Sequence, residues 1–423
     1  MLFAPDPGRS LRPSRSSRFA RPTAAVVVAV AAALALGPVA PASAATATDS
    51  APRPTAYVLN GTAGTMSAVD TATGTVTATV NASAPDGIGS APDAEAVSPD
   101  GSRVYVVNDG DNSVSVIDTA TGKVTARVPV GRNPLGAVVG PTGRTVAVTG
   151  DNVYLIHANS LKATRLRTVL RPAGVAFSPD GTELYVSCRG SLLVFDTATG
   201  ALADTLSAAD GSLPVISADG TTAYVLSGAG VPTVTVVDIA TDTAVATIPV
   251  SEGQGGYDSL TLSPDGTELY ADIVGTMNVI STSDDTVSTS YPAVGHVVFS
   301  PNGALAYEAA FTTQDTGITA IDPATGAVVG SIPAAGSFLD LAFSPDSSRA
   351  YVASTSEVQV YDTATSSLIA TVPTAPDSAR SPSPTARHIC STPMPGTCPY
   401  SISGPTPSPR PSPVRRWTRT RSR

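Results

Sequence analysis

Carboxylates are the most numerous of the side chains in this sequence that could bind a metal ion or act in catalysis: Asp and Glu together number 34, whereas His and Cys number three each. A carboxylate can bind a divalent cation or act as a general acid or base. Most of these acids fall in short Asp-Gly or Asp-Thr motifs typical of turns, where their oxygens accept backbone N–H bonds. Glu95, Asp258 and Asp340 lie instead in stretches expected to form inner strands. These acids, with His296 at the start of a similar stretch, are our candidates for a cation or polar-ligand site.

The sequence lacks the groups of residues that nucleophilic or redox catalysis needs. His157 and His296 are the two histidines of the repeated region, too few for a polyhistidine metal centre, and His157 replaces an Asp of a repeated turn. No Cys-x-x-Cys-His haem motif and no Gly-x-Ser-x-Gly nucleophile elbow occurs. Cys188 is expected to be a small buried residue. We therefore expect no catalytic residue and no cofactor, which favours a protein that is not an enzyme and leaves any metal unknown.

An internal repeat positions these residues. Its fullest copy reads Gly-Val-Ala-Phe-Ser-Pro-Asp-Gly at residues 174–181, then Leu-Tyr-Val at 184–186 and Leu-Val-Phe-Asp-Thr-Ala-Thr-Gly at 193–200. Short β-rich runs closed by Pro, Asp and Gly predict antiparallel hairpins. The Ser-Pro-Asp-Gly element recurs, in places altered, at Ser98, Gly140, Ser178, Ser217, Ser263, Ser300 and Ser344. A period near 40 residues with several strands in each unit is typical of a β-propeller blade.

The number of units favours eight blades. Residues 57–80 supply three outer strands without an inner one, and seven fuller units begin near Ala94, Gly136, Gly174, Leu213, Asp258, Gly295 and Leu339. The predicted fold is all-β, a propeller of four-stranded antiparallel blades, eight in number with the first incomplete. A seven-bladed ring is the alternative. No stretch after Pro373 resembles the inner strand that the first blade needs.

Four segments of the second unit resemble the YVTN β-propeller repeat family: Tyr-Val-Val-Asn at 105–108, Val-Ser-Val-Ile-Asp at 114–118, Thr-Gly at 121–122 and Val-Pro-Val-Gly at 128–131. The resemblance covers about residues 57–373. It implies a scaffold shared with surface-layer and extracellular binding proteins, while lactonase-type and quinoprotein-type propellers are more distant, enzymatic relatives. Fold alone does not select among these functions.

The first 44 residues predict an export signal. An apolar run at residues 24–36 and the small residues Ala42, Ser43 and Ala44 follow a positive stretch made by Arg9, Arg12, Arg15, Arg18 and Arg21. This order is typical of a cleaved secretory signal, and an uncleaved membrane anchor is the alternative. We expect contact with the membrane only during export, and a mature protein that is secreted or held at the cell wall.

The rest of the chain divides into a short linker at 45–56, the propeller at 57–374 and a disordered tail rich in Pro, Ser and Arg at 375–423. A frameshift could also have produced this tail. Back-translated with GC-rich codons and read one frame over, residues 382–402 can give an inner strand, an Asp-Gly turn and a further strand. The coding DNA separates the two origins.

Charge narrows the class of partner. Residues 45–375 contain twelve basic and 32 acidic residues, a formal charge near −20. Such a body repels phosphate, so we expect no nucleic-acid partner. The function that we predict is a monomeric, non-enzymatic binding or scaffold module for an extracellular protein or a cell-wall glycan. The alternatives are a lactonase-like propeller hydrolase, with a metal or carboxylate site at the channel mouth, and a structural surface-layer component.

Overall fold

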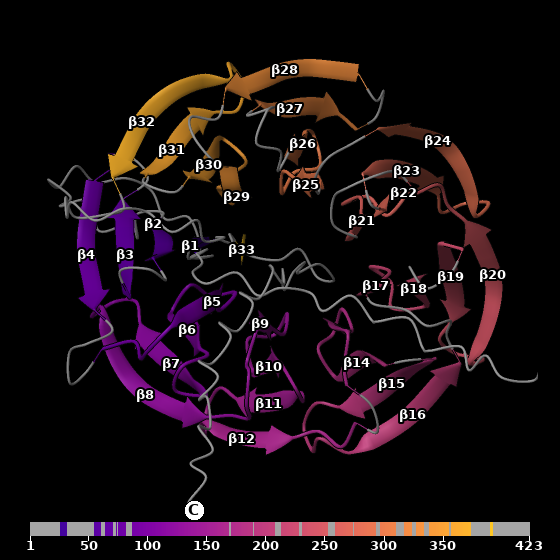
Figure 1. The fold of residues 1–423 in the computed structure, drawn as a ribbon, viewed down its shortest axis with the longest axis horizontal. Helices are drawn as coiled ribbons and strands as arrows, with labels where there is room; N and C mark the ends of the chain where they lie inside the picture. Colours follow the sequence, from indigo (N-terminus) through magenta and orange to yellow (C-terminus); the bar gives the residue numbers. More distant parts are fainter. Residues whose placement is uncertain are drawn as a thin grey trace, which may run out of the picture.

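Eight blades, each of four antiparallel strands, surround a central axis in the computed structural model, and a fifth short strand adds to the sheet of blade 1 (Figure 1). The structure describes residues 26–31, 390–391 and 55–373, the last range with gaps at 61–63, 71–72, 74, 82–86, 169–170, 189, 208–212, 228–230, 253–258, 274, 293–296, 310–316, 324–326, 334–337 and 355–356. The predicted all-β, eight-bladed propeller is confirmed. Each blade is a meander in which consecutive strands pair from the axis outward, and in blades 2 to 8 short connections join the strands.

The first four blades share this order from inner to outer strand. Their strands are β1 (Val26–Ala31), β2 (Thr55–Asn60), β3 (Thr65–Asp70) and β4 (Thr75–Asn81) in blade 1; β5 (Pro92–Val97), β6 (Arg103–Asn108), β7 (Ser113–Asp118) and β8 (Lys123–Pro129) in blade 2; β9 (Gly136–Val139), β10 (Thr145–Thr149), β11 (Tyr154–His157) and β12 (Lys162–Arg165) in blade 3; β13 (Gly174–Phe177), β14 (Glu183–Cys188), β15 (Ser191–Asp196) and β16 (Leu202–Ser207) in blade 4.

The remaining blades repeat the pattern. Their strands are β17 (Leu213–Ile216), β18 (Thr222–Ser227), β19 (Thr233–Asp238) and β20 (Thr243–Pro249) in blade 5; β21 (Ser259–Leu262), β22 (Glu268–Ile273), β23 (Thr276–Ser281) and β24 (Thr286–Pro292) in blade 6; β25 (Val297–Phe299), β26 (Ala306–Ala309), β27 (Gly317–Asp322) and β28 (Ala327–Pro333) in blade 7; β29 (Phe338–Phe343), β30 (Arg349–Ser354), β31 (Glu357–Asp362) and β32 (Ser367–Pro373) in blade 8.

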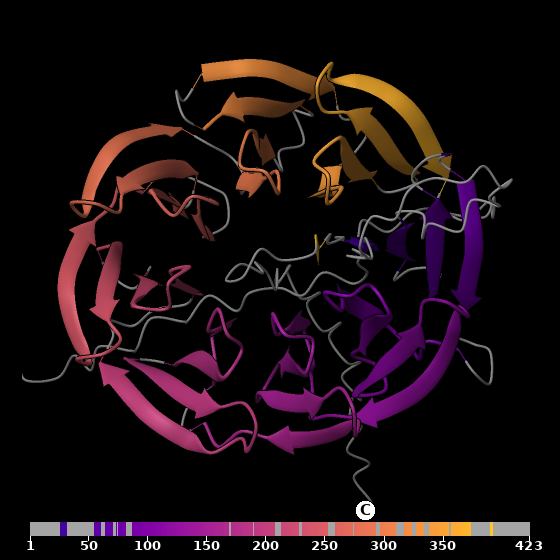
Figure 2. The same ribbon diagram turned by 180° about the vertical axis from the view of Figure 1, so that it is seen from behind.

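Blade 1 closes the ring. The sequence provides three outer strands here, and β1 takes the inner place by pairing antiparallel with β2, with Val26 opposite Asn60. This strand lies inside the predicted export signal. A two-residue strand, β33 (Cys390–Ser391), pairs parallel with β1 from the other end of the chain. Blades 1 and 8 meet as neighbours in both views of the ring (Figure 2). Removal of the first 44 residues would leave blade 1 with the three strands that the sequence predicts.

The repeated acids hold the turns together, as predicted. Asp100 accepts hydrogen bonds from the Ser98 hydroxyl at 2.6 Å and from the Ser102 backbone N–H at 3.0 Å. Gly101 has φ +67°, which only glycine adopts without strain. In the next turn on the same side of the blade, Asp118 lies opposite Arg103 and accepts the Thr121 backbone N–H at 2.8 Å. These bonds explain why so many acids of the sequence are structural.

The core lies between neighbouring blades. Tyrosines in the second strand of several blades are almost fully buried, among them Tyr105, Tyr185, Tyr307 and Tyr351. Cys188 is buried, as predicted, and burial raises the pKa of its thiol. His157 ends β11, and its carbonyl accepts the Leu161 N–H at 2.8 Å in the predicted turn. The described part of the chain contains no helix that could cross a lipid bilayer.

Candidate functional site: the outer side and rim of blades 2 and 3

The described part of the chain includes two of the four predicted site residues. Asp258 and His296 lie outside the described residues. Glu95 lies on β5 opposite Val106, and Asp340 lies on β29 opposite Ala353. Strand β1 of blade 1 contacts both β5 and β29 and so lies between the two blades that carry these acids. Glu95 is three residues before Ser98 but Asp340 is four before Ser344, so the two acids do not occupy equivalent positions.

Glu95 is buried between blades rather than exposed at the channel mouth. It is 2% exposed, and Val97, two residues on, packs with Tyr57 in the layer between blades 1 and 2. Burial raises the pKa of Tyr57, and the nearby Glu95 carboxylate raises it further. The equivalent positions of the following blades are apolar: Ala137, Val175, Pro214, Leu260, Val297 and Leu341. Blade 2 therefore places a carboxyl where the repeat otherwise has an apolar side chain.

Blade 7 contains a second, partly buried carboxyl that sequence reasoning missed. Glu308 lies on the second strand of the blade, β26, opposite Val297 on the inner strand. In blade 2 the Glu is on the inner strand instead, where Glu95 lies opposite Val106 of the second strand. Burial raises the pKa of Glu308 to about 7. Its charge also raises the pKa of Tyr291 on the outer strand of blade 6, after burial as the main cause. The sequence signal was a Glu within an apolar second strand.

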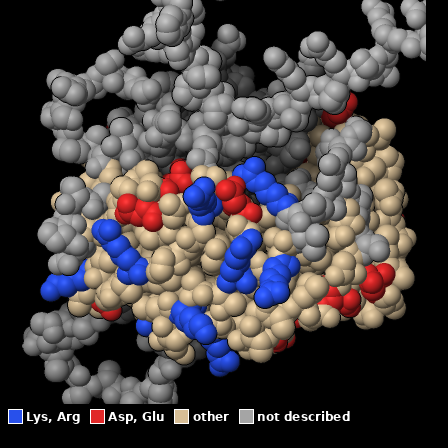
Figure 3. Space-filling view, turned by 60° about the horizontal axis from the view of Figure 1, so that its bottom comes forward, with Lys and Arg blue, Asp and Glu red and all other residues tan. Residues whose placement is uncertain are grey.

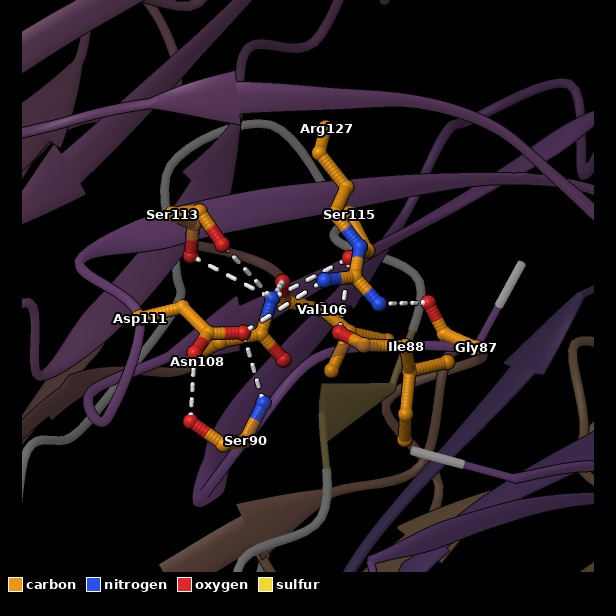
Figure 4. A network of polar contacts seen from close by, with 9 residues as sticks. All are labelled: Gly87, Ile88, Ser90, Val106, Asn108, Asp111, Ser113, Ser115 and Arg127. Carbon is orange, nitrogen blue, oxygen red and sulfur yellow. Dashed lines mark hydrogen bonds and ion pairs between the residues drawn. The ribbon is translucent and has the colours of Figure 1, made fainter. Parts of the chain in front are cut away.

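Asn108 centres a polar network at the hairpin between β6 and β7 (Figure 4). Its side-chain N–H groups lie 3.3 Å from the Ser113 hydroxyl and 3.1 Å from the Ser115 hydroxyl, and Ser115 donates to the Ile88 carbonyl at 2.7 Å. Gly89 has φ +103°, and a Cβ there would lie 2.6 Å from the Asn108 side chain. Glycine at position 89 therefore allows the loop before β5 to pack closely against the hairpin.

Asp111 extends this network to the outer strand. It accepts hydrogen bonds from the Ser90 backbone N–H at 2.8 Å and the Ser90 hydroxyl at 2.5 Å. These bonds, together with Arg127, hold the pKa of Asp111 below its usual value. Arg127, on β8, lies 3.5 Å from the Asp111 carboxylate and donates to the Gly87 carbonyl (Figure 4). An inner loop and an outer strand of blade 2 are thus joined by side chains.

The polar contacts continue from the β6–β7 hairpin of blade 2 onto blade 3. The Asn133 backbone N–H donates to the Asn112 side chain at 3.3 Å, and the Asn133 side chain donates to Asp151 at 2.9 Å. Arg171 lies 3.5 Å from Asp151. We call the loops that carry these residues, 87–91, 108–113, 130–135 and 150–153, the blade 2–3 rim. Hydrogen bonds between neighbouring blades fix its shape.

Basic side chains cover the outer side of the same two blades (Figure 3). Residues 123–171 contain eight basic residues and one acid, Asp151. All eight are exposed, and they lie on β8, on β12, in loops next to these strands or, for Arg144, in the turn between β9 and β10: Lys123, Arg127, Arg132, Arg144, Lys162, Arg165, Arg167 and Arg171. We call these eight residues the basic surface. Sequence reasoning missed it because the charges were summed over the whole body, although their clustering along the chain was visible.

A cavity on the opposite, turn-bearing side of the ring offers less chemistry. Its volume is about 430 Å³, between blades 6 and 7, and its lining includes Asp265 and Glu268. A hydrogen bond from Ser263 holds the pKa of Asp265 below its usual value. Glu268 accepts the Tyr270 hydroxyl at 2.7 Å. Both acids are thus used by the repeat itself. Within the described ranges no three His, Cys, Asp or Glu residues lie close enough to hold a metal ion.

Comparison with known families matches the model described as outer membrane protein assembly factor BamB over residues 62–329. The match covers more than half of the chain, so this protein belongs to that β-propeller family. It supports the propeller part of the sequence resemblance and not its YVTN subtype. A comparison with curated proteins gives no match.

Two solved structures share the fold. Hydrazine synthase of Kuenenia stuttgartiensis is 20% identical with a TM-score of 0.51, covering 75% of this chain and 99% of that chain. The dihydro-heme d1 dehydrogenase NirN, solved in complex with DHE, is 19% identical with a TM-score of 0.64, covering 86% of this chain and 81% of that chain. At these identities the likeness extends to the fold alone.

Proposed function

We propose that this propeller is an exported, YVTN-type binding or scaffold module that is not an enzyme, and that the blade 2–3 rim presents polar groups to an extracellular protein or a cell-wall glycan. The observation that carries the proposal is the side-chain bonding of this rim, where Asn133 links Asn112 to Asp151 across two blades. Binding residues are commonly found on loops held by a rigid scaffold. A rim fixed in advance loses less conformational entropy on binding.

Co-sedimentation with isolated cell walls tests the proposal. Asn133→Ala combined with Asp151→Ala removes the link between the two blades at the rim. We expect this variant to bind cell walls at least tenfold more weakly than the unaltered protein. Asp238→Ala, in a turn on the opposite side of the ring where Asp238 accepts the Thr241 backbone N–H at 2.8 Å, is the control and should bind normally. Equal binding by all three proteins, or none by the unaltered protein, would overturn the proposal.

An enzymatic propeller is the second candidate. Both solved structures named above are enzymes by title, a synthase and a dehydrogenase. For this chain the corresponding hypothesis is a lactonase-like hydrolase with a metal or carboxylate site at the channel mouth, built from Asp258, His296 or Asp340. Metal analysis of the purified protein separates the candidates, because a tightly held stoichiometric divalent ion would favour the hydrolase. A structural surface-layer component would instead self-assemble at high concentration.

A further inference from the structure

The charges of this ring are strongly segregated. Residues 123–171 carry a formal charge of +7, from eight basic residues and one acid. Residues 190–375 contain Arg349 as their single basic residue and twenty acids, a formal charge of −19. The acidic majority therefore surrounds one basic side, and the potential changes sign between blades 2 and 3 and the rest of the ring.

The basic surface is not a requirement of the blade architecture. Strands β8 and β12 carry Lys123, Arg127, Lys162 and Arg165, whereas the outer strands β4, β20, β24, β28 and β32 contain no charged residue at all. Charged side chains often protect exposed sheet edges from pairing. Five outer strands of the same ring have no charged side chains for this purpose. The charges on β8 and β12 therefore have another explanation.

The basic side chains are also largely available. Arg127, Arg165 and Arg171 contact Asp111, Asn152 and Asp151, respectively. In the described part of the chain the other five side chains make no hydrogen bond or ion pair: Lys123, Arg132, Arg144, Lys162 and Arg167. Along a strand, Lys123 and Arg127 are about 13 Å apart at about 3.3 Å per residue. Cations spread over the outer side of two blades match an extended chain of anionic groups better than a small anion.

We propose that the basic surface binds a linear polyanion outside the cell, a polymer with phosphate or carboxylate groups repeated along its backbone. This inference rests on the proposed function and names the chemistry of its partner. Neutralised phosphates or carboxylates release counterions, so binding is driven electrostatically and weakens with salt. The acidic remainder of the ring repels the polymer, so the protein binds through one side only.

A second copy of this chain fits the surface less well. Acids elsewhere in the ring are mostly held in turns, as Asp219 is by the Ser217 hydroxyl at 2.6 Å and Asp238 by the Thr241 N–H at 2.8 Å. Asp204 on β16 is the one acid on a described outer strand of blades 4 to 8. No outer strand among them offers a row of acids complementary to β8 and β12. Nucleic acid also repeats phosphates along its backbone, and the oligonucleotide in the test below distinguishes it.

Binding of the full chain to two labelled probes tests the proposal: long-chain inorganic polyphosphate and polygalacturonate, with neutral dextran as the blank. The test variant combines Lys123→Gln, Arg132→Gln, Lys162→Gln and Arg167→Gln. The control combines Val245→Glu, Thr247→Glu, Thr289→Glu and Thr371→Glu, which changes the net charge equally on outer strands of other blades, at exposed positions. Thermal denaturation establishes that both variants fold.

We expect the test variant to lose at least tenfold in affinity for polyphosphate, polygalacturonate or both, and the control less than threefold. The dependence on salt should also become shallower in the test variant alone. Whichever probe binds identifies the anionic group. Equal losses in both variants, no binding of either probe, or tighter binding of a single-stranded oligonucleotide would overturn the proposal. A low-salt dimer abolished by the test variant would assign the surface to a second copy and also overturn it.

Failure of this inference can be told from failure of the proposed function. Cell walls stripped of anionic polymers serve as a second substrate in the co-sedimentation assay. If the chain binds stripped walls as well as intact ones and neither probe binds, the polyanion is wrong and the binding module stands. If it binds neither wall preparation nor either probe, both proposals fall.

Discussion

The outer strands of blades 2 and 8 show which positions the fold constrains. Strand β8 reads Lys-Val-Thr-Ala-Arg-Val-Pro and β32 reads Ser-Leu-Ile-Ala-Thr-Val-Pro. Strand β8 pairs with β7 in the same register in which β32 pairs with β31. The register shifts at the equivalent position of both pairs, after Val116 in β7 and after Val360 in β31. Val128 and Val372 are buried at the same position, 3% and 2% exposed. Both strands end in an exposed Pro, but at two other exposed positions Lys123 and Arg127 of β8 replace Ser367 and Thr371 of β32. Folding selects the buried residues, and the exposed ones are available for a partner.

The shared interior gives the largest expected effect. Tyr105 in blade 2 and Tyr351 in blade 8 are both 0% exposed at the same position of the second strand. Tyr105→Ala and Tyr351→Ala should each lower the free energy of unfolding by about 3–5 kcal/mol, the usual cost of deleting a buried aromatic ring. Chemical denaturation measures both. A cost in one blade more than twice that in the other would show that the two blades are not equivalent inside.

The partly buried carboxyl of blade 7 gives the next largest effect. The folded pKa of about 7 for Glu308 lies above the usual value of 4.5, so the folded protein keeps a proton that the unfolded chain releases between these values. Stability therefore falls as pH rises through this window. Glu308→Gln should stabilise the protein by about 1–3 kcal/mol at pH 8 and hardly at all at pH 4. Asp204→Asn on β16 is the matched exposed control and should change nothing. The same gain from Glu308→Gln at both pH values would refute this account of burial.

The turn acids should behave alike in both blades. Burial opposes ionisation of Asp100 and Asp346, but hydrogen bonds from the flanking Ser residues lower the pKa of both on balance. Their stabilisation is present above pH 4 and is lost as pH falls through the lowered pKa. Asp100→Ala and Asp346→Ala should each cost about 1 kcal/mol at pH 7, from lost hydrogen bonds. Thermal melts from pH 2 to pH 7 measure this. An Ala variant that loses stability on acidification as steeply as the unaltered protein would count against the assignment.

The smallest effect on stability is expected at the exposed positions that distinguish the two strands. Ser367→Lys with Thr371→Arg places the residues of β8 on β32, where positions 367 and 371 are exposed. The free energy of unfolding should change by less than about 0.5 kcal/mol. Affinity for polyphosphate should rise, since a second basic strand is created. A destabilisation above about 1 kcal/mol would mean that folding also constrains these positions.

Local chemistry explains what the sequence could predict. Turns built from Ser, Asp and Gly are specified by adjacent residues, so the repeat, the blade count and the role of Asp100 follow from the sequence alone. The inner strand of blade 1 could not be predicted in the same way, because an apolar run such as residues 24–36 suits an export signal and a buried strand equally. Which of these it forms depends on partners distant in the sequence.

The candidate site was harder to predict, for two physical reasons. Inner strands of a propeller are buried on both faces, so the sequence does not show whether Glu95 faces a neighbouring blade or the channel. The basic surface depends on bringing residues of β8, β12 and their loops to one side of the ring. The net charge near −20 does not reveal the basic surface, because it is summed over the whole body. The clustering of Lys and Arg between residues 123 and 171 is the sequence feature that indicates this surface.

Lysine acetylation with and without bound polyphosphate tests the central claim most directly. The chain contains two lysines, Lys123 and Lys162, and the structure places them on the outer strands of blades 2 and 3. Mass spectrometry can read the acetylated fraction at each one, with the α-amino group as an internal reference. If the basic surface binds the polymer, both lysines should react several-fold more slowly in the complex while the reference is unchanged. Unaltered reactivity of both lysines under conditions where the polymer is bound would contradict the claim.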